Sequence, residues 1–204
     1  NAEQISKDIT LSEFSCYSQW GDDGIISFLV EYLRLNKKFF VEFGVEDYTE
    51  SNTRYLLKTK NWSGLVFDGS KNNIDFIQRD QIYWRHDLTA KCAFITRENI
   101  QTLIEEIVDP IEVGLLHIDI DGNDYWVWRS LEINADIVII EYNSLFGHES
   151  SVTIPYSPNF IRSEAHFSEL YFGASLAALI ELGREKGYFF IGTNSNANNA
   201  YFLH

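Results

Sequence analysis

Acidic and amide side chains recur within or directly after apolar runs of this sequence. They are Glu42, Asp68, Asp87, Asp119, Asp121, Glu141 and Asn143. In an open α/β sheet the carboxyl ends of the strands share one edge, and ligands bind outside that edge. A single acid there can equally cap the helix that follows it, because carboxylates favour helix N-termini. As a set, these residues predict a ligand site at one edge of a sheet.

Two of the acids have a spacing that suits a nucleoside ligand. Asp68 follows Glu42 by 26 residues, and an acid at the end of a second strand can accept hydrogen bonds from ribose hydroxyls. A nicotinamide cofactor would share that acid, but its pyrophosphate requires a G-x-G-x-x-G turn. The chain has the sequence GVEDYT over residues 44–49 instead, and these acids would repel pyrophosphate. S-adenosylmethionine (SAM) carries a positive sulfonium and no phosphate, so the acidic turn favours it over NAD.

The elements that position these residues alternate between strand-like and helix-like segments. The expected strands cover residues 39–43, 64–67, 82–84, 113–118, 137–140, 188–191 and 200–203. Asp87 is expected to close the third. Near-continuous apolar strands separated by helices are typical of a parallel sheet that is covered on both faces. We therefore expect one Rossmann-like α/β domain over residues 1–204, with a mostly parallel seven-stranded sheet and a C-terminal antiparallel hairpin.

Two segments lie outside this alternation. Residues 1–36 are expected to form an N-terminal helical cap. Residues 142–172 contain Gly147, Pro155 and Pro158 and show little periodicity, so they are expected to form a long loop or lid on the acceptor side of the site.

The composition disfavours two classes of protein. A formal charge of −14, from 16 Lys and Arg against 30 Asp and Glu, disfavours a polynucleotide partner, which needs a basic face. No apolar run approaches the roughly 18 residues of a membrane span. Two cysteines, Cys16 and Cys92, are too few for a disulfide framework, and they indicate a reducing compartment, the cytoplasm. The oligomeric state stays open.

Several motifs, in this order and spacing, resemble the FkbM-type class I SAM-dependent methyltransferases. The branch they resemble is the one found in bacterial capsule and lipopolysaccharide gene clusters, and the likeness covers nearly the whole chain. The motifs span residues 18–24, 41–45, 50–53, 64–70, 118–126, 140–143, 155–156 and 171–176. The resemblance implies SAM as the cofactor and a small acceptor, either a sugar hydroxyl or a nucleotide-linked precursor of a surface polysaccharide.

The same resemblance assigns roles to cofactor residues. Glu42, Gly44 and Ser51 would hold the methionine part of SAM, Asp68 the ribose, and Asp119 would lie near the sulfonium and the acceptor. Gln19 and Asp87 complete the expected cofactor set. The sequence departs from the family in its first turn, where Glu46 and Tyr48 stand in place of the usual glycines.

A divalent cation is a further expectation. Asp119 resembles the metal-binding acid after the fourth strand of catechol-type O-methyltransferases, and Glu141 and Asn143 lie where their later ligands fall. These oxygen ligands suit Mg²⁺ or another hard divalent cation. Those enzymes also have a lysine soon after the acid, where this chain has Gly122, so a site without metal stays open.

Transfer to a hydroxyl usually needs a group that takes the proton. The candidates are Asp119, Asp121, Glu141, His117 and His148. His117 alternates with Asp119 along the fourth strand, but a histidine in an apolar strand is also typical of a hydrogen-bonded core residue.

The acceptor itself would contact Asn143, Tyr156, Arg162 and Tyr171. Arg162 would supply a positive charge for a phosphate or carboxylate. Two alternatives remain open: an NAD-dependent oxidoreductase on the same type of sheet, and a catalytically silent binding module.

Overall fold

The computed structural model describes residues 2–204, and its centre is a seven-stranded sheet in the order β3-β2-β1-β4-β5-β7-β6. The strands are β1 (Phe39–Phe43), β2 (Ser63–Asp68), β3 (Leu88–Cys92), β4 (Val113–Ile118), β5 (Ile137–Glu141), β6 (Phe189–Thr193) and β7 (Asn199–Leu203). Strands β1 to β5 pair in parallel, and β7 runs antiparallel between β5 and β6. The expected sheet and its C-terminal hairpin are confirmed.

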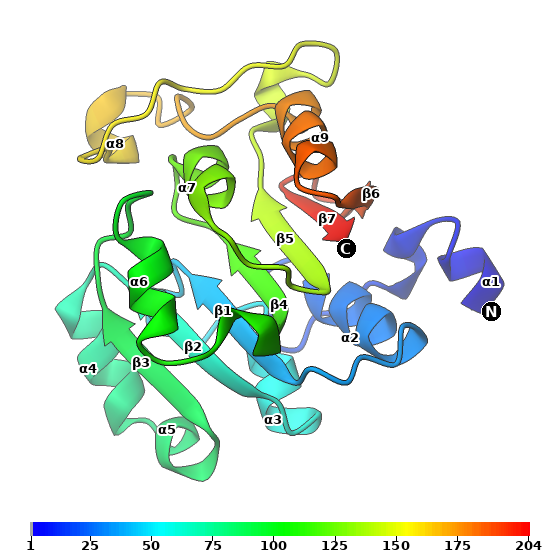
Figure 1. Cartoon of the computed structure of the whole chain (residues 1–204), viewed down its shortest axis with the longest axis vertical. Coiled ribbons are helices and arrows are strands. Elements are labelled where there is room, and N and C mark those ends of the chain that lie inside the picture. The colour runs from blue at the N-terminus through cyan, green and yellow to red at the C-terminus, as the bar shows by residue number, and fades with distance from the viewer. Residues whose placement is uncertain (1) are drawn as a thin grey trace.

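Helices cover both faces of the sheet (Figure 1). One face carries α6 (Ile100–Glu105), α7 (Asp124–Ser130) and α9 (Leu176–Glu185). The other carries α2 (Asp22–Tyr32), α3 (Arg54–Thr59), α4 (Lys71–Arg79) and α5 (Gln81–Arg85). Successive strand residues point to opposite faces, so in β1 Val41 packs into the first core and Phe40 into the second. This two-sided burial explains why the central strands are apolar almost throughout.

The third strand is not where the sequence pattern places it. Residues 82–84 lie in α5, whose N-cap Asp80 accepts a hydrogen bond from the Ile82 N–H at 2.7 Å. Strand β3 follows at Leu88–Cys92. Asp87 therefore precedes the strand instead of closing it, and its carbonyl accepts a hydrogen bond from Gly64 N at the beginning of β2. The placement of Asp87 was wrong, and the reason for a cofactor role disappears with it.

The two segments outside the alternation also have short helices. The N-terminal part contains α1 (Ala2–Ile5) and the 3₁₀ turn η1 (Ile9–Ser12) before α2. A second 3₁₀ turn, η2 (Pro110–Glu112), leads into β4. Residues 142–172 contain η3 (Ser144–Phe146) and α8 (Arg162–Ala165) and are otherwise irregular.

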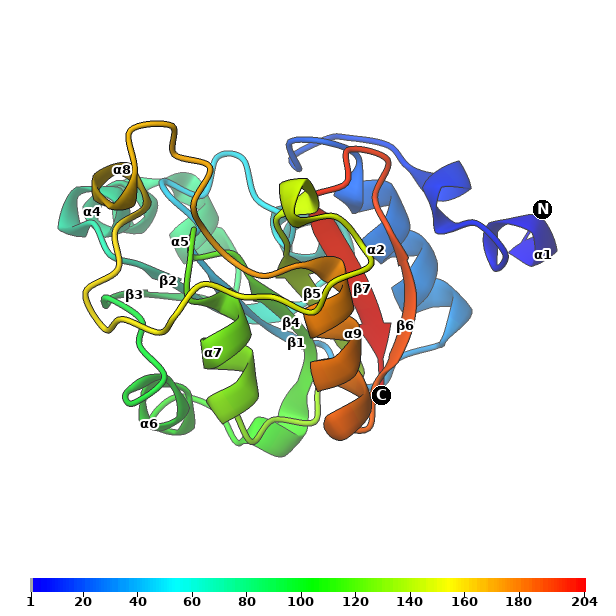
Figure 2. The ribbon, with the colours of Figure 1, turned by 90° about the horizontal axis from the view of Figure 1, so that it is seen from above.

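Residues 142–172 lie beside α7 in two views (Figures 1 and 2). Hydrogen bonds hold them there: Trp126 Nε1 donates to the carbonyl of Ile154, and Asn123 Nδ2 donates to that of Ser157, both at 2.8 Å. The segment is thus fastened to the N-terminal end of α7, next to the carboxyl end of β4. None of the helices in residues 2–204 has the length and apolarity needed to cross a bilayer.

Candidate active site

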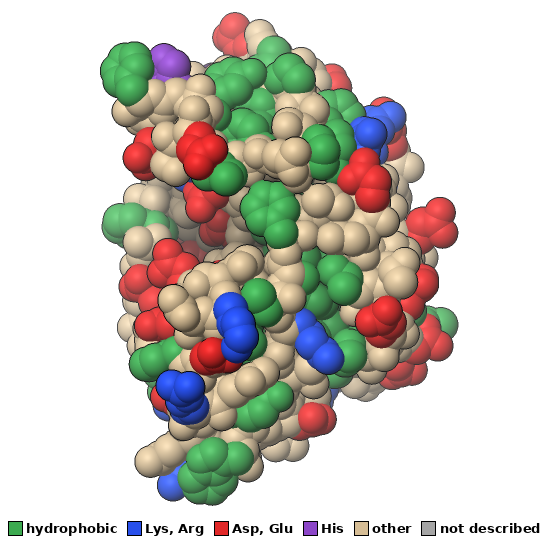
Figure 3. All heavy atoms as spheres, turned by 90° about the vertical axis from the view of Figure 1, so that its left-hand side faces the viewer, with side chains coloured by type: hydrophobic (Ala, Val, Ile, Leu, Met, Phe, Trp, Pro, Cys, Tyr) green, Lys and Arg blue, Asp and Glu red, His purple; other side chains and the backbone are tan. Residues whose placement is uncertain are grey.

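A cavity of about 430 Å³ opens at the carboxyl ends of the parallel strands. Residues that follow β1, β2, β3 and β4 line it, together with Glu141 at the end of β5. Figure 3 shows the hollow, with acidic side chains within and around it. Its volume lies in the range of about 300–1,000 Å³ that is usual for small-molecule sites. The edge predicted from the sequence therefore holds a cavity of the right size for a cofactor.

The cavity is strongly acidic. Its carboxylate side chains are Asp22, Glu42, Glu46, Glu50, Asp68, Asp119, Asp121 and Glu141. Arg162 is the one Lys or Arg among the lining residues, which all lie in the described part of the chain. Clefts lined by one sign of charge attract ligands of the opposite sign, so the cavity favours a cationic group and disfavours free phosphates.

Two residues in the turn after β1 have positive φ angles, which are more usual for glycine. Glu46 has φ +48° and Tyr48 has φ +62°, a region that costs a residue with a side chain roughly 1–2 kcal/mol. Surrounding contacts hold them: Tyr48 is buried with its hydroxyl 2.9 Å from Thr53 Oγ1, and Glu46 N–H donates to Asp68 at 2.9 Å. Glu46 and Tyr48 therefore both have the positive φ that glycine favours, although neither is a glycine.

Gly44 is required by the protein itself. Its φ is +69°, and a Cβ on it would lie 1.7 Å from the carbonyl oxygen of Asp119. The ends of β1 and β4 therefore approach each other closely at this point. Gly44 also lines the cavity, so its backbone lies at the cavity wall while the absence of a Cβ allows the close approach of β4.

Asp68 lines the cavity at the end of β2, where the ribose-binding acid was expected. Its Oδ1 accepts hydrogen bonds from Ser70 N at 2.7 Å and Asn73 Nδ2 at 3.0 Å, and its Oδ2 accepts one from Glu46 N. A carboxylate has about four lone-pair sites, so one site on Oδ2 remains for a ligand.

Glu42 is buried, and both of its oxygens already have partners. Oε2 accepts hydrogen bonds from Ser51 Oγ at 2.6 Å and from the N–H and hydroxyl of Thr53. Oε1 accepts one from Asn52 N at 3.1 Å and is paired with His117. The carboxylate therefore fixes the loop 51–53 at the cavity wall and has little capacity left to hold a ligand directly.

His117 is a satisfied core residue. Its Nδ1 lies 2.8 Å from Glu42 Oε1, and its Nε2 lies 3.1 Å from Asn52 Nδ2. Burial lowers the pKa of His117, but the hydrogen bond with Glu42 and the charge of Glu42 outweigh it, so the net direction is upward. Burial raises the pKa of Glu42, and the contact with His117 reverses this. With both ring nitrogens engaged, His117 is poorly placed to act as the expected base.

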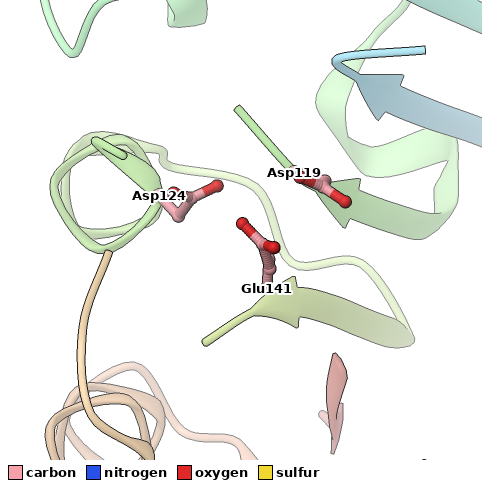
Figure 4. Close-up of side chains that lie close together, drawn as sticks. All are labelled: Asp119, Asp124 and Glu141. Carbon is pink, nitrogen blue, oxygen red and sulfur yellow. The ribbon is translucent and has the colours of Figure 1, made fainter. Parts of the chain in front are cut away.

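Three carboxylates converge beside the end of β4. Asp119 follows β4, Asp124 begins α7 and Glu141 ends β5, and one oxygen of each lies within 4.8 Å of the others (Figure 4). Asp124 is held in place because its oxygens accept hydrogen bonds from Ile120 N at 2.8 Å and Gly122 N at 2.9 Å. We call Asp119, Asp124 and Glu141 the carboxylate cluster.

Burial dominates the ionisation of this cluster. It raises the pKa of Asp119 to about 7; the charge of His117 opposes this rise, and that of Asp124 adds to it. Burial also raises the pKa of Asp124 to about 6, against the hydrogen bonds from the backbone. Burial and the charge of Asp119 raise the pKa of Glu141 well above its ordinary range. Ionisation of all three carboxylates by the protein alone therefore costs free energy.

Asn143 does not belong to the cluster. Its Nδ2 donates to the carbonyls of Leu170 and Phe172, and its Oδ1 accepts a hydrogen bond from Leu145 N. The side chain is thus used to fold residues 143–172, and these contacts give no support to the expected roles in binding a metal or the acceptor. Asp124 was missed in its place; the available signal was its position at the first turn of a helix, where a carboxylate reaches back to the preceding loop.

Arg162 reaches the cavity from residues 142–172. Its Nη1 lies 2.5 Å from Asp121 Oδ1, its Nε donates to the Glu169 carbonyl at 2.7 Å, and its guanidinium lies 3.6 Å from the centre of the Phe172 ring. Asp121 is mostly exposed and is occupied by this ion pair. The pair connects the segment 142–172 to the loop after β4.

Three expected residues lie away from the cavity lining. Tyr156 donates to Glu98 and lies under the guanidinium of Arg97, Tyr171 packs against the ring of Phe160, and His148 is exposed in the loop. Their positions give no support to the substrate-binding and catalytic roles expected of them. Gln19, by contrast, lines the cavity.

Other lining residues were missed. They are Asp22, Glu50, Asn52, Phe94, Asn123, Phe160 and Asn199. Phe94 follows β3, so the misplacement of that strand concealed it. Asp22 lies in the motif at residues 18–24 and is the first residue of α2. It accepts a hydrogen bond from Asn199, more than 170 residues away, which no local pattern indicates.

The fold is shared with known methyltransferases, although no family model and no curated protein matches the sequence. An O-methyltransferase from Bacillus cereus in complex with SAH is 11% identical, with a TM-score of 0.54 over 99% of this chain and 87% of that one. The N-terminal domain of EvdMO1 with SAH bound is 10% identical, with a TM-score of 0.52 over 99% and 92%. A SAM-dependent methyltransferase from Clostridium acetobutylicum ATCC 824 is 8% identical, with a TM-score of 0.53 over 99% and 96%. The chain has the class I methyltransferase fold.

Proposed function

We propose that this chain transfers a methyl group from SAM to a hydroxyl of a small polar acceptor, a sugar or a nucleotide-linked precursor of a bacterial surface polysaccharide. The observation that carries the methyl transfer is an acidic cavity at the carboxyl edge of a class I methyltransferase fold, with Asp68 at the end of β2. The polysaccharide role rests on the resemblance to FkbM-type enzymes alone.

In this proposal, different residues of the cavity bind the ribose, the adenine and the methionine part of the cofactor. The free lone pair of Asp68 accepts a hydrogen bond from the ribose. Phe94 and Ile95 follow β3, which pairs with β2 at Asp68, and they offer an apolar wall for the adenine. Ser51 and Gln19 line the part of the cavity nearer β1 and α2, where the methionine part would lie.

SAM supplies an electrophilic methyl group on a sulfonium. The acceptor oxygen attacks this methyl in line, the carbon–sulfur bond breaks, and its electron pair stays on the sulfur of S-adenosylhomocysteine (SAH). The hydroxyl proton goes to a carboxylate or to water. Asp119 is the best-placed side chain for this role, because it lies in the cavity after β4 and its carboxylate accepts no hydrogen bond from the described residues. Alignment and proton removal are the main demands of such a displacement.

The charge of the cavity favours an uncharged sugar face near the reacting centre. A phosphate would meet eight carboxylates and a single arginine that is already paired with Asp121. A nucleotide-linked acceptor would therefore have to place its phosphates at Arg162, toward residues 142–172. We propose that this segment forms the acceptor side of the site.

The test is turnover with a panel of acceptors. The protein is incubated with SAM and with neutral sugars, amino sugars or nucleotide sugars, and SAH and the methylated product are measured by mass spectrometry. We expect one of these classes to be methylated. Asp119→Asn keeps the size and removes the charge, so turnover should fall about 100-fold or more, with SAH binding retained. Asp75→Asn makes the same change on α4, where Asp75 pairs with Lys71 away from the cavity lining, and should leave turnover unchanged. Full activity of Asp119→Asn would place the reaction elsewhere.

A further inference from the structure

The carboxylate cluster, in which Asp124 is buried and Asp119 and Glu141 are half-buried, lacks the cationic partners that such acids usually have. No Lys or Arg within residues 2–204 forms an ion pair with Asp119, Asp124 or Glu141. The nearby Arg162 is bound to Asp121 instead. Buried charges in proteins are normally paired, neutralised by protonation or bound to metals, so the ionised cluster favours a cationic partner from outside the chain.

Unpartnered oxygen atoms point to the same conclusion independently of the charge. Oε2 of Glu141 is buried and accepts no hydrogen bond from any described residue, and its side chain points toward Asp119 and Asp124 (Figure 4). Oδ1 of Asn123 is also buried without a partner, in a residue that lines the cavity next to Asp124. Buried polar atoms without partners are rare in native proteins and often mark a missing ion or water.

We infer that the carboxylate cluster is a binding site for a divalent cation, with Asp119, Asp124 and Glu141 as its protein ligands. All three offer carboxylate oxygens and no histidine or cysteine, a set that suits Mg²⁺, Mn²⁺ or Ca²⁺ and does not suit zinc. Two oxygens on opposite sides of Ca²⁺, each at about 2.4 Å, are about 4.8 Å apart. The mutual separations within 4.8 Å thus allow one ion to contact all three side chains.

The site is preformed on one side and open on the other. Hydrogen bonds from Ile120 N and Gly122 N orient Asp124. Asp119 and Glu141 line the cavity, whereas Asp124 does not. The remaining coordination positions of the ion would therefore face the cavity. That an acceptor oxygen occupies one of them rests on the proposed function; the binding of the ion does not.

The experiment is a titration of the cofactor-free protein with Mn²⁺, followed by electron paramagnetic resonance and by calorimetry, with Ca²⁺ and Mg²⁺ as competitors. We expect one site with a dissociation constant below about 1 mM. Glu141→Gln should weaken it at least tenfold, and Asp119→Asn provides a second variant if the first does not fold. Asp121→Asn removes the same charge two residues from Asp119, outside the cluster, and should weaken binding by about threefold at most.

Two results would overturn the inference. One is that the wild-type protein binds none of the three ions at about 10 mM. The other is equal weakening by Glu141→Gln and Asp121→Asn, which would mean that the ions respond only to the general negative charge. A separate titration with SAH in the presence of a chelator distinguishes the cation site from the proposed function. SAH binding without ion binding contradicts only the cation site, and ion binding without SAH binding contradicts only the methyltransferase function.

Discussion

Oε1 of Glu42 lies 2.8 Å from Nδ1 of His117, across paired positions of the neighbouring strands β1 and β4. Both side chains are buried. From this pair, hydrogen bonds extend to Ser51, Asn52 and Thr53, so that one wall of the cavity is fixed by a polar network that originates inside the sheet. Fully satisfied buried networks of this kind make a site rigid.

Replacing Glu42 should therefore destabilise the protein. Glu42→Gln places an amide N–H₂ where the carboxylate accepts five hydrogen bonds, and we expect the free energy of unfolding to fall by about 3 kcal/mol. Chemical denaturation measures this. Glu112→Gln is the matched control, because Glu112 is exposed. Equal stability of the two variants would mean that the network contributes nothing.

Gly44 and Gly147 separate the effects of backbone conformation and close packing. Both have positive φ, +69° and +72°, but a Cβ would meet Asp119 at Gly44 and nothing within 4 Å at Gly147. Gly147 has ψ −171°, so its backbone lies in a region that is essentially restricted to glycine, and Gly147→Ala should cost about 1–3 kcal/mol. Gly44→Ala should cost at least about 3 kcal/mol, because the backbone of β4 must also move. Similar melting temperatures for the two variants would show that the β1–β4 contact is looser than the structure indicates.

Asp119→Asn should stabilise the metal-free protein at alkaline pH. The pKa of Asp119 is about 7 in the folded protein, against an ordinary value of 3.8. The stability associated with its protonated form is fully present below about pH 4. That stability is lost as the pH rises through 7. The amide of the Asp119→Asn variant does not ionise, so the variant keeps its stability over the same pH range.

With a chelator present, we expect the variant to gain about 2 kcal/mol over the wild type at pH 8, and less at pH 4.5. Thermal or chemical denaturation across this pH range measures the gain. Asp75→Asn should show no such gain, because the hydrogen bond with Lys71 lowers the pKa of Asp75 instead of raising it. A pH-independent difference between Asp119→Asn and the wild type would mean that Asp119 ionises normally.

Arg162→Ala tests the role of residues 142–172. If Arg162 positions the acceptor, its loss should raise the acceptor KM about tenfold while the SAH dissociation constant stays unchanged. Arg184→Ala, on the exposed side of α9, should change neither. Equal losses in acceptor and cofactor binding would assign Arg162 a structural role through its ion pair with Asp121.

The sequence predicts the sheet well where strands are buried on both faces and poorly at its edge. Strand β4 is buried throughout and stands out as an apolar run. In the edge strand β3 only Leu88 and Ala90 are buried, and the apolar residues at 82–84 of α5 gave a stronger signal. The misplacement of Asp87 and the omission of Phe94 both follow from this one error.

The site could be predicted as a position but not as a set of contacts. Strand ends indicated Asp68, Asp119 and Glu141, because the edge of a parallel sheet is common to all its strands. That Asp124 turns back to meet them depends on two hydrogen bonds to its own preceding loop. Whether Glu42 and His117 are free or paired depends on the strand register. Neither feature is visible in the local pattern of residue types.

The central claim is that the cavity binds SAM, and calorimetric titration with SAM, SAH and NAD tests it most directly. We expect SAM and SAH to bind at one site and NAD to release no heat. Asp68→Asn should weaken SAH binding by about 1–3 kcal/mol, the cost of losing a hydrogen bond to a charged group, while the control Asp75→Asn leaves it unchanged. Binding of NAD together with no binding of SAM or SAH would contradict the account.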